Sequence, residues 1–118
     1  MKKINVEVMS SEEALKRFER AWTKAKPDAS AEPTIGVGSI ADLTTLLSPK
    51  RMELLRFVVG HPALSIRALA QSLGRDYKNV HTDVSELESS HLLSRDEEGR
   101  VSAPYDEIVI RAPLNQAA

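Results

Sequence analysis

The residues with the most distinctive chemistry gather in one short stretch of the sequence, RDYKNVHTDV at positions 75–84. Val80 and Val84, followed by Leu87, are spaced four and three residues apart, which is the repeat of a helix buried along one face. Off this stripe, the start of the predicted helix carries Tyr77, Lys78, Asn79, His81 and Thr82. A solvated helix usually has carboxylates there, because they suit the positive end of the helix dipole. The stretch therefore predicts a negatively charged partner near this end of the helix.

The polar side chains of this predicted helix have the chemistry of a nucleic-acid contact. Lys78 offers a charge to a phosphate or a guanine, Asn79 can pair with an adenine, and Thr82 can touch a thymine methyl group or a phosphate. Contacts to the phosphate backbone are expected beside them, from Tyr77, His81, Arg67 and Arg75. Taken one at a time, these residues also fit a solvated helix face with a tyrosine that partly covers the core.

The distribution of charge favours the contact over the solvated face. The whole chain of 118 residues has a net charge of -1. Residues 50–82 nevertheless hold six basic side chains against two acidic ones, a net charge of +4, whereas residues 83–100 hold six acidic against two basic ones. A basic block therefore ends where the predicted helix passes from its polar start to its acidic tail, which indicates a local anionic partner.

Residues 1–25 are predicted to form a strand-helix arm. Alternating Ile4, Val6 and Val8 are typical of a short strand with one covered face. The helix that follows, to about residue 25, has an apolar stripe made of Leu15, Phe18 and Trp22. Residues 26–33, KPDASAEP, contain two prolines and no periodicity, so they are predicted to be a linker.

The arm is not expected to fold alone, because a strand and one helix bury too little surface. Its apolar stripe is expected to pack on the core of its own chain, on a second copy of the chain or on a foreign partner. The proline-containing linker makes exchange between chains possible. Among these alternatives we favour a homodimer formed through the arm and the last strand.

The body, residues 34–112, is predicted to be α+β, with a tail at residues 113–118. Helices are predicted to begin after Ser39, Ser48, Ser65 and Asp76. The last two are short, amphipathic and joined by a tight turn at Gly74, which is the pattern of a helix-turn-helix. Two strand-like pieces then flank an acidic turn at residues 96–99 and predict a hairpin, or wing, and residues 106–111 predict a last strand.

The segment LSIRALAQSLGRDYKNVHTDVSELESSHLLSRDEEGRV, about the central third of the chain, resembles the winged helix-turn-helix of MarR-like and ArsR-like prokaryotic regulators. The pieces LTTLLSPKRMELLRFV, GRDYKNVHTDV and PYDEIVI are similar to a family of small archaeal and bacterial proteins assigned to DNA binding, some of them antitoxin-like partners of small toxins. The resemblance implies that the helix from Tyr77 is the recognition helix and that Arg95 to Arg100 form the wing. The acidic tip of this wing departs from many DNA-binding relatives and disfavours deep insertion into the minor groove.

Composition argues against several other classes of protein. With no cysteine, the chain has no disulfide, Cys-based zinc site or thiol nucleophile. The spacing of His61, His81 and His91 matches no metal motif, and no nucleophile motif or complete phosphate loop is present. The sequence therefore predicts no enzyme activity, no metal and no cofactor. No apolar run approaches the roughly 20 residues that cross a bilayer, and residues 1–13 lack the apolar core of a signal peptide, so a cytoplasmic protein is expected.

The expected function is sequence-specific binding of double-stranded DNA in transcription regulation, by a repressor that reads a palindromic operator as a dimer. The alternative is an antitoxin, a protein-interaction module that neutralises a small toxin through its arm and autoregulates the operon.

Overall fold

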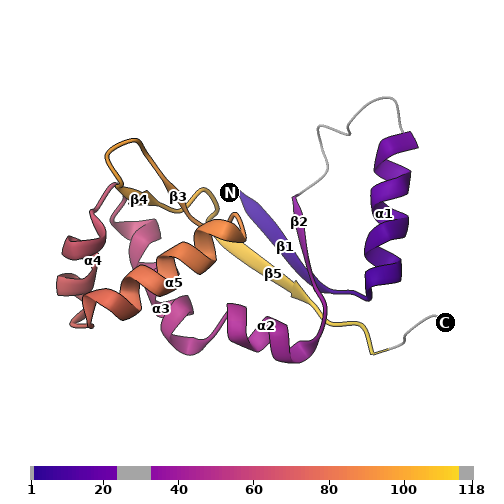
Figure 1. Ribbon diagram of the computed structural model, residues 1–118, viewed down its shortest axis with the longest axis horizontal. Helices are drawn as coiled ribbons and strands as arrows, with labels where there is room; N and C mark the ends of the chain where they lie inside the picture. The colour runs from indigo at the N-terminus through magenta and orange to yellow at the C-terminus, as the bar shows by residue number, and fades with distance from the viewer. Residues whose placement is uncertain (1, 24–32, 115–118) are drawn as a thin grey trace. The chain divides into compact units, whose positions relative to one another are not determined.

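A computed structural model of the protein describes residues 2–23 and 33–114 (Figure 1). The chain divides into two compact units, with boundaries between Thr45 and Leu46 and again between Asp106 and Glu107. The sheet unit contains residues 3–45 and the chain from Glu107 onward, and the helical unit contains residues 46–106 with Lys2. The predicted linker at 26–33 lies outside the described residues except for Pro33, and so does the tail from 115.

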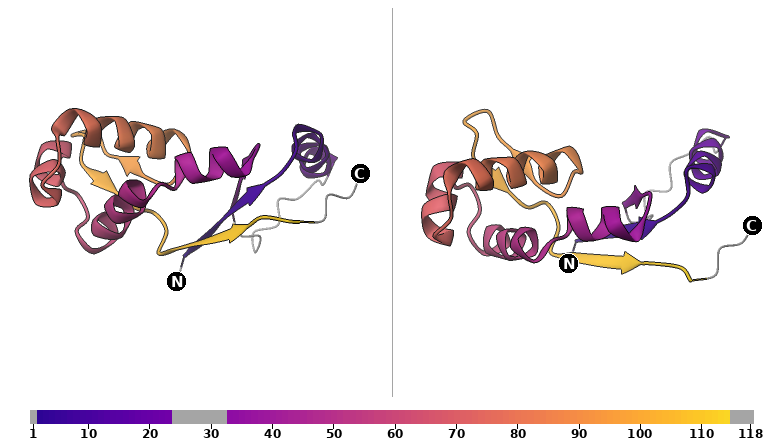
Figure 2. Two further views of the ribbon diagram at one scale, coloured as in Figure 1. Left: turned by 90° about the horizontal axis from the view of Figure 1, so that it is seen from below. Right: turned by 60° about the horizontal axis from the view of Figure 1, so that its bottom comes forward.

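The sheet unit is built on a parallel sheet of three strands, β1 (Lys3–Val8), β2 (Thr34–Val37) and β5 (Glu107–Arg111). The strand order is β2-β1-β5, and both neighbours run parallel to β1 (Figure 2). Ile4 and Val6 of the central strand are buried, as their alternation predicted, but Val8 is only partly buried, and Glu7 on the other face is buried as well. β1 and β5 were predicted as strands, but the pairing that joins the arm strand to strands of the body was not predicted.

Gly36 shows how closely β2 is packed. A Cβ atom at this position would lie 2.9 Å from the Sδ atom of Met9, which is itself buried. A glycine in a strand often marks such a close approach.

Helix α1 (Ser11–Thr23) is tied to β1 by an ion pair. The hydroxyl of Ser10 caps α1 by accepting a hydrogen bond from the Glu13 amide at 3.1 Å. Glu7, only 6% exposed, accepts two hydrogen bonds from the Arg17 guanidinium, both of 2.9 Å. The hydrogen bond to Glu7 raises the pKa of Arg17 above its ordinary value. Helix α2 (Ile40–Leu46) follows β2 and is capped by Ser39, as predicted.

The helical unit contains three helices, α3 (Pro49–Gly60), α4 (Ile66–Leu73) and α5 (Tyr77–Ser89). The predicted starts are confirmed, because Ser48, Ser65 and Asp76 each accept a hydrogen bond from a backbone amide of the following helix. Gly74 ends α4 with a positive φ of 64°, a conformation that favours glycine.

Apolar residues from each of these helices form the core of the helical unit. α5 buries the whole predicted stripe, and α3 and α4 contribute side chains that pack with it. The buried residues are Leu54, Leu55, Val58, Ile66, Leu69, Ala70, Val80, Val84 and Leu87.

A two-stranded antiparallel hairpin follows α5 and is formed by β3 (Ser94–Arg95) and β4 (Val101–Ser102). Its turn is closed by Asp96, whose Oδ1 accepts hydrogen bonds from the amides of Glu98 and Arg100, each at 2.9 Å. Val101 also forms a bridge with Leu64, in the segment between α3 and α4. The predicted hairpin is therefore confirmed, and the described helices and small sheets make the fold α+β, as predicted. Among the described residues, no helix has both the length and the apolar character needed to span a membrane.

We predict that Arg17→Ala lowers the free energy of unfolding by about 1–2 kcal/mol, because it leaves the buried Glu7 carboxylate without its counter-charge. Lys16→Ala is the matched control, since Lys16 and its partner Glu12 are both largely exposed and 3.7 Å apart. Urea unfolding followed by circular dichroism measures both variants. Equal stability of the two variants would show that the Glu7–Arg17 pair does not hold α1 to the sheet.

Candidate nucleic-acid interface

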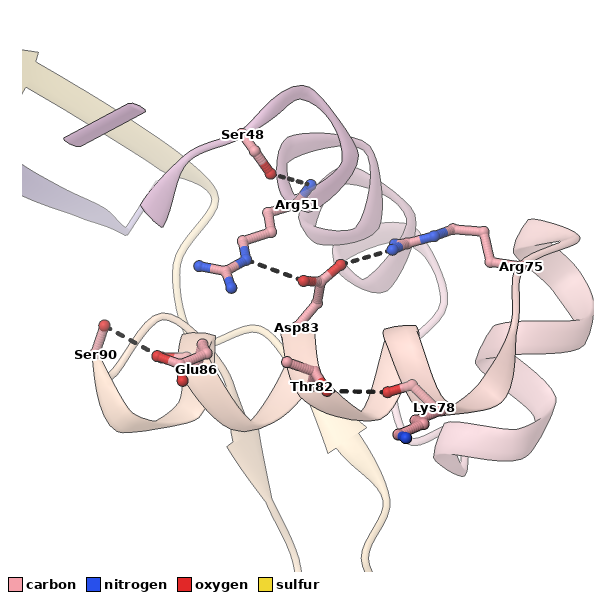
Figure 3. A network of polar contacts seen from close by, with 8 residues as sticks. All are labelled: Ser48, Arg51, Arg75, Lys78, Thr82, Asp83, Glu86 and Ser90. Atoms are coloured by element: carbon pink, nitrogen blue, oxygen red, sulfur yellow. Dashed lines mark hydrogen bonds and ion pairs between the residues drawn. The ribbon is translucent and has the colours of Figure 1, made fainter. Parts of the chain in front are cut away.

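Four of the residues predicted to contact nucleic acid lie exposed on the first half of α5: Lys78, Asn79, His81 and Thr82. Lys78 and Thr82 are one turn apart on the same face, and the Thr82 hydroxyl donates a hydrogen bond to the Lys78 carbonyl at 3.1 Å (Figure 3). The hydroxyl oxygen remains able to accept a hydrogen bond, and its methyl group remains available for an apolar contact. The first turn of α5 carries no acidic residue. The face therefore presents a cation, an amide and a hydroxyl beside the positive end of the helix dipole.

A second group of predicted residues lies where α4 and α5 adjoin. The Arg67 guanidinium lies 6.0 Å from the centre of the Tyr77 ring, and the Tyr77 and His81 rings are 6.0 Å apart at an angle of 44°. Tyr77 is 49% exposed. A cation within about 6 Å of an aromatic ring is attracted to its face. Arg67, Tyr77 and His81 thus form a row of exposed donors that extends the α5 face toward α4.

Asp83 lies at the border of the buried stripe of α5, one turn after Asn79. Its Oδ1 atom accepts a hydrogen bond from Arg51 Nε of α3 at 3.1 Å, and its Oδ2 atom accepts one from Arg75 Nη2 at 2.7 Å (Figure 3). The three side chains are only 13–15% exposed. One carboxylate therefore ties α5 both to the start of α3 and to the turn that precedes α5.

This arrangement changes the role expected of Arg75. Arg75 was expected to contact phosphates, but its guanidinium is largely buried and paired with Asp83. Its Nη1 atom is buried and has no hydrogen bond to the described residues. The guanidinium is held against Asp83 because α5 directs that carboxylate toward the turn rather than toward solvent. Arg75 is thus placed to orient α5.

Sequence reasoning missed Asp83 and Arg51, although one signal was present. Asp83 lies three residues after Val80 and four before Leu87, so it borders the buried stripe. A carboxylate in such a position is partly desolvated and needs a cationic partner. The basic residues of α3 and of the turn before α5 were the candidate partners for the Asp83 carboxylate.

The two arginines of the hairpin are also engaged with carboxylates. Arg95 donates to Glu88 through Nε at 3.1 Å and through Nη2 at 2.7 Å. This hydrogen bonding lowers the pKa of Glu88 and raises that of Arg95. Arg100 Nη2 lies 3.0 Å from Glu98 Oε2, in an exposed pair. Both cations of the predicted wing are therefore partly neutralised, whereas Arg67 and Lys78 are in no ion pair among the described residues.

The residues predicted to bind a protein partner lie on α1, in the other unit. Leu15 is 57% exposed and Phe18 is 65% exposed. The side chain of Trp22 lies outside the described part of the structure. Within the described residues, no group of three or more His, Asp or Glu side chains is arranged to hold a metal ion.

Comparison with known proteins identifies a family that the chain matches. The model of a family described as HVO_A0114 matches residues 46–110, which is more than half of the chain and includes the whole of the helical unit except Lys2. No curated protein and no solved structure matches the chain.

We predict that Asp83→Asn destabilises the protein by about 2–3 kcal/mol, because it leaves two partly buried guanidinium groups without a counter-charge. Glu86→Gln, an exposed change of the same kind one turn away on α5, should alter stability by less than about 0.5 kcal/mol. Chemical denaturation of the two variants and the parent chain makes the comparison. If Asp83→Asn were as stable as Glu86→Gln, the Asp83 ion pairs would not determine the position of α5.

Proposed function

Because the family match covers more than half of its length, the chain belongs to the HVO_A0114 family, and we propose that it is a sequence-specific DNA-binding transcription regulator. In this proposal α4 and α5 are the two helices of a helix-turn-helix, α5 is the recognition helix, and the β3–β4 hairpin is the wing. The observation that carries the proposal is the exposed first turn of α5, which has no acidic residue and follows a turn held in place by Asp83.

The order and pairing of elements in the helical unit support this assignment. α3 is followed by the bridge residue Leu64, then by α4, a turn of three residues (Gly74–Asp76), α5 and the hairpin. The bridge from Leu64 to Val101 adds a third extended segment to the hairpin, next to β4. This is the order of a winged helix-turn-helix, in which the second helix of the pair enters the major groove.

The exposed residues can be divided by the part of DNA that they suit. Asn79 and Thr82 have the hydrogen-bonding groups and the methyl group that read base edges in the major groove. Lys78 can serve either a guanine or a phosphate. Arg67, Tyr77 and His81, in a row beside them, suit the phosphate backbone, which fixes the orientation of a protein on DNA.

Three of the arginines expected at the interface, Arg75, Arg95 and Arg100, have a smaller part in this proposal. Arg75 acts through α5, since Asp83 already binds its guanidinium. Arg95 and Arg100 of the wing each lie beside a carboxylate, and the turn between them is acidic. Electrostatic repulsion between that turn and DNA phosphates makes the wing a weak contact, so the affinity depends mainly on α4 and α5.

A single helical unit of this size offers few phosphate contacts, and a regulator gains both affinity and specificity by binding as a two-fold dimer. We therefore propose a homodimer that reads two half-sites of a palindrome, about 34 Å or one helical turn of DNA apart, and acts as a repressor.

The exposure of Leu15 and Phe18 on α1 favours a second candidate function, binding of a protein such as a small toxin. The product of a neighbouring gene is the natural partner to test, by co-expression with the full chain and with the variant Leu15→Glu. A stable complex that Leu15→Glu abolishes would support an antitoxin, and no complex would leave only the regulator.

We predict that binding to the DNA upstream of its own gene weakens steeply as salt rises. Each phosphate that is neutralised contributes a log-log slope of about -0.9, so two copies with a few contacts each give a slope on the order of -4 to -8. Fluorescence anisotropy titrations at several salt concentrations measure the slope. A slope near zero, or no binding to any upstream fragment at low salt, would rule out the DNA-binding function.

A further prediction distinguishes base contacts from phosphate contacts. Asn79→Ala should cost roughly 1–3 kcal/mol on the preferred operator and little on random DNA, because its amide pairs with adenine and has no charge. Arg67→Ala should weaken binding to both DNAs alike, since phosphates are the same along any duplex. Neither residue is part of the core, so circular dichroism should show an unchanged fold. If Asn79→Ala lowered specific and random binding by the same factor, Asn79 would not be a base contact.

A further inference from the structure

Strand β5 lies at the edge of the parallel sheet, in the order β2-β1-β5. Its inner edge pairs with β1 along five residues, and its outer edge pairs with no other strand among the described residues. Its sequence is EIVIR, three β-branched residues between one acid and one base. Ile110 is 52% exposed.

Such an edge is a template for pairing with another strand. Proteins usually protect an exposed edge with charges, prolines or bulges within the strand, or with a covering element. β5 instead has apolar residues of high β-propensity at its centre and charges only at its ends. The edge therefore favours an extended partner of complementary sequence.

The sequence of β5 is complementary to itself when two copies run antiparallel. If Val109 lies opposite Val109 of a second copy, Glu107 lies opposite the second copy's Arg111, and Ile108 lies opposite its Ile110. Opposite charges directly across a strand pair are favourable, and so are pairs of β-branched residues. We propose that β5 pairs antiparallel with β5 of a second copy, about a two-fold axis at Val109, and that this pairing forms the dimer.

The register centred on Val109 is favoured when it is compared with the neighbouring registers of two antiparallel β5 strands. A shift that keeps the faces of the two sheets aligned moves the strands by two residues at a time. With Ile108 opposite itself, Asp106 would face Ile110. With Ile110 opposite itself, Arg111 would face Val109. Only the register centred on Val109 places both charges of β5 opposite a charge of the other sign.

The same register continues the two faces of the sheet across the axis. On one face, Ile4 lies beside Ile108 and Val6 beside Ile110, so the apolar rows of the two copies join and the exposed Ile110 gains a neighbour. On the other face, Lys3 lies beside Glu107, with an ion pair of 3.6 Å, and Glu7 beside Arg111. Charges of alternating sign would then cross four strands in one row. The product is a continuous sheet with the order β2-β1-β5-β5-β1-β2.

The β5–β5 pairing would be the contact surface of the homodimer in the proposed function. Only its effect on DNA binding rests on that proposed function. The contact is isologous, as in most homodimers, since the same residues contribute from both copies. Dimer formation is measured without DNA, so a chain that does not bind DNA can still form this dimer. If the dimer fails, the contacts of a single α5 to DNA remain to be tested separately.

Exchange of the charges at the ends of β5 tests the pairing. Glu107→Arg alone, or Arg111→Glu alone, places like charges opposite each other twice in the dimer, and the dimer should dissociate about tenfold more readily. The double variant restores opposite charges between copies and should recover the dimer. Within one copy, however, it sets a second cation beside Lys3 and a second carboxylate beside Glu7, so recovery can come only from the contact between copies. Sedimentation equilibrium measures all four proteins.

A cysteine at the axis provides a second test that preserves the charges and the fold. The chain has no native cysteine. Opposed residues of an antiparallel pair have Cα atoms about 4.5–5.5 Å apart, within disulfide range. Val109→Cys should therefore cross-link two copies under mild oxidation. Ile108→Cys and Ile110→Cys are the matched controls, because each is offset from its own copy by two residues, beyond the roughly 7 Å reach of a disulfide.

Recovery of the dimer by the double variant, together with cross-linking at least about tenfold faster at position 109 than at the two controls, is the expected result. A monomeric parent chain, or a dimer that the single charge variants leave unchanged, would overturn the proposal. Faster cross-linking at position 108 or 110 would overturn the register.

Discussion

The position of α5 depends on the carboxylate of Asp83. It borders the buried stripe of α5 and binds Arg51 of α3 and Arg75 of the turn at the same time. This contact is costly to break at the carboxylate, because removing Asp83 leaves two largely buried guanidinium groups without a counter-charge. The rotation of α5 about its axis is fixed as a result, and with it the outward direction of Lys78 and Thr82 (Figure 3). Asp83 thus positions the helix, and Lys78 and Thr82 are left exposed on a different side of it.

Much of the local structure could be predicted because its causes lie within a few residues. Ser48, Ser65 and Asp76 cap their helices through a side chain that reaches the next amides, and Gly74 adopts a positive φ that disfavours other residues. The buried stripe of α5 follows from spacing alone. For the same reason Lys78, Asn79 and Thr82 could be predicted to be exposed.

What could not be predicted depends on residues far apart in the sequence. The period of β1 indicates a covered face but not its neighbours, so its parallel pairing with β2 and β5 had no signal in the chain. Arg75 was expected to contact phosphates because a basic residue beside a recognition helix often does. Its partner Asp83 is eight residues away, and Arg51 is a further 24 residues before Arg75, so the three-way contact exists only after α3 and α5 pack together.

The most direct test of the central claim is a map of amide chemical shifts as the DNA upstream of the gene is added to the full chain. We expect the largest changes at Lys78, Asn79 and Thr82, with smaller changes at Arg67. The amides of α1 should be nearly unaffected, since Lys16 and Arg17 are already paired with carboxylates and the exposed Leu15 and Phe18 have no charge to offer a phosphate. Changes concentrated on α1, or on the hairpin and not on α5, would contradict the assignment of α5 as the recognition helix.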